Sequence, residues 1–92
     1  MDLQEFKLAQ NPKQNWSPEL LALWYDGRGE WQKAHDLVDA REGKMAARVH
    51  AYLHRKEGDQ WNAEYWYRRA GESRPNLTLE EEWEELVLRF LS

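Results

Sequence analysis

Two stretches of the chain share one pattern: Gly29-Glu30-Trp31-Gln32-Lys33-Ala34 and Gly58-Asp59-Gln60-Trp61-Asn62-Ala63, which begin twenty-nine residues apart. In each stretch a glycine and an acidic residue precede a segment that has alanine at its first inward position. A repeat of this length is typical of helix pairs that bury their apolar faces by stacking on a neighbouring pair. The pattern therefore predicts an all-α protein that binds through a surface of stacked helices.

Capping and turn residues around these stretches predict about five helices. Ser17-Pro18-Glu19 combines an N-cap, a proline at the first helical position and an early acid. Thr78 and Glu81 have the spacing of a capping box. The expected helices span residues 18 to about 25, 30–40, 44–56, 60–70 and 78–91. Residues 1–16, interrupted by Asn11-Pro12, are expected to form an arm that is loosely ordered or docked on the body.

The composition indicates one small domain whose core depends on aromatic rings. The 92 residues include six Trp, four Tyr and two Phe but no Cys, so neither disulfides nor thiolate metal sites are expected. The longest apolar run is the six residues from Leu20 to Tyr25, which is too short to cross a bilayer. The first residues lack the basic and apolar regions of a secretion signal. We expect a cytoplasmic protein that is not inserted in a membrane.

Charge is distributed unevenly along the chain. The formal net charge is −4, yet residues 41–75 carry eight Lys or Arg against five acids, while both flanking segments are acidic. General nucleic-acid binding depends on a net positive face that neutralises phosphates. The overall acidity therefore argues against a nucleic-acid partner.

Residues at fixed positions in the two repeats suggest a family. The second repeat has Ala51, Gly58-Asp59, Ala63, Tyr67, Ala70 and Pro75, and the first has Leu21, Ala22, Tyr25, Gly29, Ala34 and Val38. With this spacing, residues 17–91 resemble the tetratricopeptide repeat family and its relatives, the Sel1-like repeats. The resemblance implies a short right-handed α-solenoid of antiparallel helix hairpins. Its single domain, 17–92, would comprise hairpins over 17–42 and 43–75 and a capping helix over 78–91.

The resemblance also implies a binding surface, because the first helices of successive units in that family line a groove that holds peptides. On the helix at 44–56 the corresponding side chains are Met45, Arg48, Val49, Tyr52, Arg55 and Lys56. Three cations around a tyrosine suit an acidic segment or a carboxylate. We therefore expect a non-enzymatic module that binds a protein or peptide and needs no cofactor or metal. The alternative for Arg48 and Arg55 is pairing within the chain to Glu81, Glu84 and Glu85.

Two histidines support a different hypothesis. His50 and His54 stand where the family prefers Leu and Tyr, and they lie one helical turn apart, as two metal ligands on one helix would. A third ligand is needed, and the candidates are His35, Asp36, Asp39 and Glu57. However, the repeat register turns His50 and His54 inward, where a neutral imidazole can simply hydrogen-bond a neighbour. The alternative function is thus a small metal-binding or catalytic protein that uses these three histidines.

In the predicted arrangement one side of the first hairpin is not covered by the second hairpin or the capping helix. The oligomeric state depends on what covers this side. Phe6 and Trp16 in the N-terminal arm could pack near Trp24 and Trp31 and cover this side. A second copy of the chain could cover it instead. We expect a monomer, with a homodimer as the alternative.

Overall fold

Six helices and no strand make up the protein in a computed structural model that describes all 92 residues. The prediction of an all-α fold is confirmed. None of the helices is both long enough and apolar enough to cross a membrane. In chain order the helices are α1 (Leu3–Leu8), α2 (Pro18–Gly27), α3 (Trp31–Asp39), α4 (Lys44–Glu57), α5 (Gln60–Arg69) and α6 (Leu79–Leu91).

The helix ends follow from the capping residues. The Ser17 hydroxyl accepts the backbone N–H of Leu20 at the start of α2. At the start of α6, Thr78 and Glu81 each accept the other's backbone N–H, which completes the predicted capping box. Gly58 ends α4 with a φ of 90°, a left-handed conformation that favours glycine. These local signals place the helix boundaries within two residues of the expected ones.

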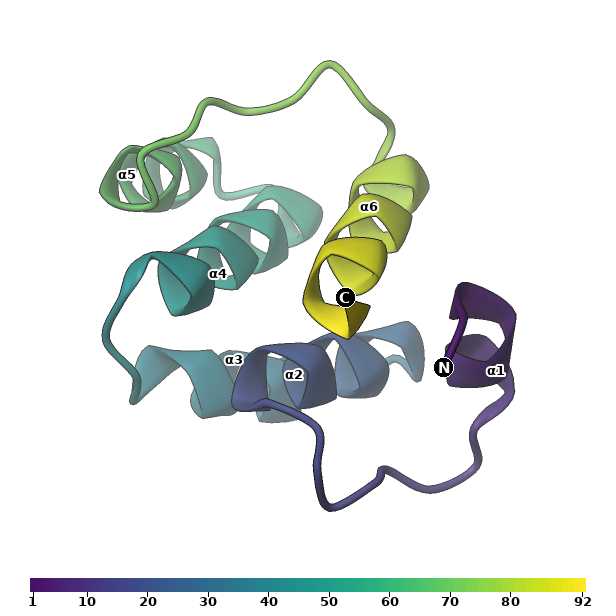
Figure 1. The fold of residues 1–92 in the computed structure, drawn as a ribbon. Coiled ribbons are helices and arrows are strands. Elements are labelled where there is room, and N and C mark those ends of the chain that lie inside the picture. The colour runs from purple at the N-terminus through teal and green to yellow at the C-terminus, as the bar shows by residue number, and fades with distance from the viewer.

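The helices are arranged as two hairpins with α4 at the centre (Figure 1). α2 packs on α3, α4 packs on α5, and α3 joins the two hairpins by packing on α4. α6 lies against both α2 and α4 and buries Leu86 and Val87. As a result, α4 has neighbours on nearly every side, and every residue from Ala46 to His54 is buried. The hairpins stack as the repeat predicts, and the right-handed solenoid stays a prediction.

The N-terminal arm contains the additional helix α1. Asp2 and Glu5 form a capping box that starts this helix, and Phe6 is fully buried, with its ring centroid 4.9 Å from that of Trp16 and 5.9 Å from that of Trp83. The expected count of five helices was therefore one too low. The Asp-x-x-Glu spacing is the sequence signal for α1 that was missed.

One face of α5 carries an exposed aromatic pair. Trp61 is 76% exposed, whereas Ala63, two residues later, is fully buried. Two residues along a helix lie about 200° apart around its axis, so they cannot share a face. The Trp61 ring instead stacks in parallel with that of Tyr65, one turn further along.

Candidate functional site

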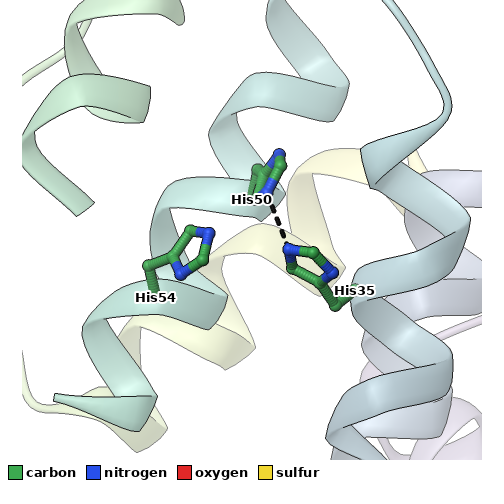
Figure 2. A group of neighbouring side chains, drawn as sticks. All are labelled: His35, His50 and His54. Carbon is green, nitrogen blue, oxygen red and sulfur yellow. Dashed lines mark hydrogen bonds between the residues drawn. The ribbon is translucent and has the colours of Figure 1, made fainter. Parts of the chain in front are cut away.

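The chain's three histidines meet between α3 and α4 (Figure 2). His50 and His54 project from successive turns of α4, and His35 faces them from α3. One ring nitrogen from each residue lies within 4.8 Å of the other two. The closest pair, Nε2 of His35 and Nε2 of His50, is 3.0 Å apart. His35 is thus the third side chain that a metal site on His50 and His54 requires.

Core packing and one hydrogen bond hold α3 against α4 next to the histidines. Ala34 and Val38 of α3 are buried in the core, and His35, next to Ala34, lies opposite His50 of α4. The indole N–H of Trp31 donates to the backbone carbonyl of Leu53, at 2.8 Å. This bond ties the start of α3 to α4 beside His54.

Indole rings enclose the cluster on two sides. The ring of Trp66, from α5, stacks on His50 with centroids 3.9 Å apart and planes inclined by 18°. The ring of Trp31 stacks on His35 at 4.9 Å. His50 is only 2% exposed. The aromatic walls therefore exclude water from the imidazole at the centre of the cluster.

This environment keeps His50 uncharged. Burial, together with the nearby His35 and His54, lowers the pKa of His50 to about 4, and Asp39 opposes this only weakly. A neutral imidazole has a nitrogen lone pair that can bind a metal. Since the Nε2 atoms of His35 and His50 face each other, one of them donates a hydrogen to the other. A metal ion would take the place of that shared hydrogen.

Carboxylates lie just outside the cluster. Glu57 Oε2 is 2.6 Å from His54 Nδ1, so the Nε2 of His54 remains available to a metal. Asp39, which is largely exposed, brings Oδ1 to 3.9 Å from His50 Nε2. Nδ1 of His35 is buried and has no hydrogen-bond partner. A carboxylate on the outer nitrogen of a metal-binding histidine orients the ring and increases its basicity.

The nitrogen donors of the cluster suit a transition metal better than a hard cation. Zn–N bonds are about 2.0–2.1 Å long, so two nitrogens on a tetrahedral zinc ion are about 3.3–3.4 Å apart. The closest histidine pair, at 3.0 Å, is near this separation, and the three nitrogens all lie within 4.8 Å of one another. Imidazole ligands suit Zn, Cu and Ni, whereas Mg and Ca prefer oxygen. Three protein ligands would leave one position free for water or another molecule.

The cations predicted to line a peptide groove are paired inside the protein. Arg48 is 2% exposed and lies 2.7 Å from Glu82 and 3.1 Å from Glu72. Arg55 lies 2.6 Å from Glu82 and also donates to the carbonyl of Leu77. The pairing within the chain thus occurs, but with acids other than the expected ones.

The acids named as the alternative partners have other roles. Glu81 caps α6, Glu84 pairs with Lys7 of α1, and Glu85 pairs with Arg89. Glu82 takes their place because it is the fully buried glutamate of α6. Sequence spacing alone did not identify this face of the helix.

The other residues predicted to line the groove lie in different environments. Met45 is 60% exposed, and Val49 is fully buried. Tyr52 is buried and donates its hydroxyl to Asp26, at 2.9 Å, and Lys56 donates to the same carboxylate, also at 2.9 Å. Tyr52 and Lys56 line a cavity of about 420 Å³ together with Asp26.

Comparison with known proteins adds no relative to this picture. A scan against protein-family models and searches of curated proteins and of solved structures found no match to this chain. The similarity to tetratricopeptide and Sel1-like repeats therefore remains a resemblance in sequence pattern.

Proposed function

We propose that this protein binds a transition-metal ion, with Zn²⁺ as the reference case, through His35, His50 and His54. The observation that carries the proposal is the convergence of one nitrogen from each ring to within 4.8 Å, from two different helices. The chain has only three histidines, and all three lie in this cluster.

The hydrogen bonding of the cluster favours metal binding over packing alone. A buried histidine with a purely structural role usually hydrogen-bonds a carboxylate or a carbonyl. Here His35 and His50 bond only to each other through their facing nitrogens, and the other ring nitrogen of His35 has no partner. A metal ion would use the lone pairs of all three rings at once.

Calorimetric titration of the protein with Zn²⁺ tests the proposal, in a form that carries no histidine tag. We expect one ion per chain and no binding of Mg²⁺. At a free zinc concentration of about 100 times Kd, the free energy of unfolding should rise by about 2.7 kcal/mol.

Variants identify the site. His35→Gln and His54→Gln should each abolish the stoichiometric binding, whereas the exposed α5 variant Glu64→Gln should keep it. Absence of zinc binding by the wild-type protein, or unchanged binding in both histidine variants, would overturn the proposal.

An interaction module remains a second proposal, supported by a separate observation. Trp61 is 76% exposed and stacks on the partly exposed Tyr65. Exposed Trp and Tyr side chains are frequent hot spots of protein interfaces. Affinity capture from the native cell should recover a partner with the wild-type protein and lose it with Trp61→Ser. Equal recovery with both would rule out this face.

A further inference from the structure

A second candidate site lies on the other side of α4 and shares no residue with the histidine cluster. It is the cavity of about 420 Å³, which is bordered by α1, α2, α4 and α6. This volume falls in the range of small-molecule pockets, about 300–1,000 Å³. The metal proposal makes no use of this cavity.

Two indole rings form fixed apolar walls of the cavity. The ring N–H of Trp24 donates to the carbonyl of Ala9 at 3.0 Å, and that of Trp83 donates to the carbonyl of Leu23 at 2.9 Å. Trp83 also lies so close to Gly27 that a Cβ there would be 2.9 Å from its Cζ2 atom. The rings are therefore held in place before any ligand arrives, which lowers the entropy lost on binding.

The polar part of the lining is centred on a buried carboxylate. Asp26 is 2% exposed and accepts hydrogen bonds from the Tyr52 hydroxyl and the Lys56 ammonium. Burial and the nearby Asp26 raise the pKa of Tyr52, so its hydroxyl stays protonated. An ammonium group has three N–H donors, and Lys56 uses one of them on Asp26. The other two remain available to a ligand.

The rim supplies further groups of both signs. Arg28 lies over the Trp24 ring, at 4.5 Å, and donates to the Ala9 carbonyl, which leaves most of its N–H groups unused. Lys7 and Glu84 pair with each other. Glu80 also lines the cavity and forms no salt bridge or side-chain hydrogen bond. The lining thus carries three cations and three acids, with spare donors and one free carboxylate.

We propose that this cavity binds a small zwitterion with an apolar body, such as a free amino acid with an aromatic side chain. Lys56 and Arg28 would take the carboxylate, Glu80 would take the ammonium, and the apolar body would lie against Trp24 and Trp83. The lining carries cations and acids in equal number. A zwitterion can therefore have both of its charges paired in the cavity, whereas a ligand with a single charge can have only that one paired.

Three probes with the same phenyl group separate these contributions. L-phenylalanine has both charges, 3-phenylpropanoate only the negative one, and 2-phenylethylamine only the positive one. Titration followed by the assigned indole N–H NMR signals should shift Trp24 and Trp83 but not Trp61. We expect Kd for phenylalanine to be lower by about tenfold than for either singly charged probe, or about 1.4 kcal/mol.

Surface variants complete the test without disturbing the buried carboxylate. Glu80→Gln should weaken phenylalanine binding and leave 3-phenylpropanoate binding unchanged, and Glu64→Gln should change neither. Tighter binding of either singly charged probe, or no shift of Trp24 and Trp83 with any probe at about 10 mM, would overturn the proposal. Because no metal is present in this titration, the outcome is independent of the histidine cluster.

Discussion

At the scale of single residues, His50 combines burial with contact to two other imidazoles. Its ring lies against Trp66 on one side, and His35 and His54 are both within 5 Å of it, centroid to centroid. A proton on His50 would be poorly solvated and close to two further imidazoles. Its protonation state therefore links the histidine cluster to the stability of the fold.

This link predicts an acid-sensitive metal-free protein. Folded His50 takes up a proton only near pH 4, whereas the unfolded chain does so near 6.5. Between these values the unfolded state binds more protons, so the free energy of unfolding should fall as the pH drops from about 6.5 towards 4. The pKa difference corresponds to at most about 3 kcal/mol.

Urea unfolding at pH 7.5 and 5, in the presence of a chelator, measures this effect. His50→Gln should show a smaller loss between the two pH values than the wild-type protein. An equal loss in both proteins would contradict the assignment to His50.

Glu57 gives a prediction for the metal site. Its carboxylate is 2.6 Å from His54 Nδ1 and orients the ring. Removal of such an outer partner typically weakens metal binding by about 10- to 100-fold. Glu57→Gln should therefore raise the Kd for Zn²⁺ by this factor while the unfolding temperature of the metal-free protein changes little. A Kd equal to that of Glu64→Gln would show that Glu57 does not support the site.

At the scale of elements, α6 is attached to the hairpin of α4 and α5 through a buried charge. Glu82 is fully buried, and it pairs with Arg48 and Arg55 of α4 and accepts the hydroxyl of Tyr67 from α5, at 2.6 Å. A single carboxylate thus connects three helices.

Neutralising this carboxylate should destabilise the protein strongly. Breaking a buried ion pair typically costs about 3–5 kcal/mol, because the remaining charge stays buried. We expect Glu82→Gln to lower the free energy of unfolding by about 3 kcal/mol, measured by urea denaturation at pH 7.5. Glu80→Gln, two residues earlier and exposed, should change it by less than about 0.5 kcal/mol. Similar values for the two variants would contradict the structural role of Glu82.

The sequence predicted the helices more successfully than the surfaces between them. Caps such as Ser17 and Thr78 act within one turn, so they can be recognised locally. The burial of Arg48 depends on how many helices surround α4, which no local pattern encodes. A groove on α4 was expected from the family resemblance, and three of the residues named for it, Arg48, Val49 and Tyr52, are buried.

The histidine cluster was only partly predictable, because it combines a local spacing with a tertiary contact. The spacing of His50 and His54 places them on one helix face. The approach of His35 depends on the packing of α3 on α4, which is a tertiary feature. The sequence could therefore name His35 as a candidate but could not rank it above Asp36, Asp39 or Glu57.

At the scale of the whole molecule, α1 completes the core although it has only six residues. Phe6 is fully buried between Trp16 and Trp83, whereas Leu8, at the end of the same helix, is 68% exposed. Phe6→Ala should lower the free energy of unfolding by about 3–5 kcal/mol, as expected for a large ring removed from a core. Leu8→Ala should have little effect. Thermal unfolding of both variants measures the difference, and equal midpoints would show that the arm does not contribute to stability.

The contact between α1 and α6 also brings Met1 and Leu91 near each other. Lys7 pairs with Glu84, and Met1 and Leu91 line the same surface hollow. Circular permutation is tolerated where the ends are close and the new break falls in an exposed loop. A chain joined by a short linker from Ser92 to Met1 and opened at the exposed Asn76 should keep the same packing in the order α6, α1, α2, α3, α4, α5. The position of α6 would then depend on its contacts and not on its place after α5 in the sequence.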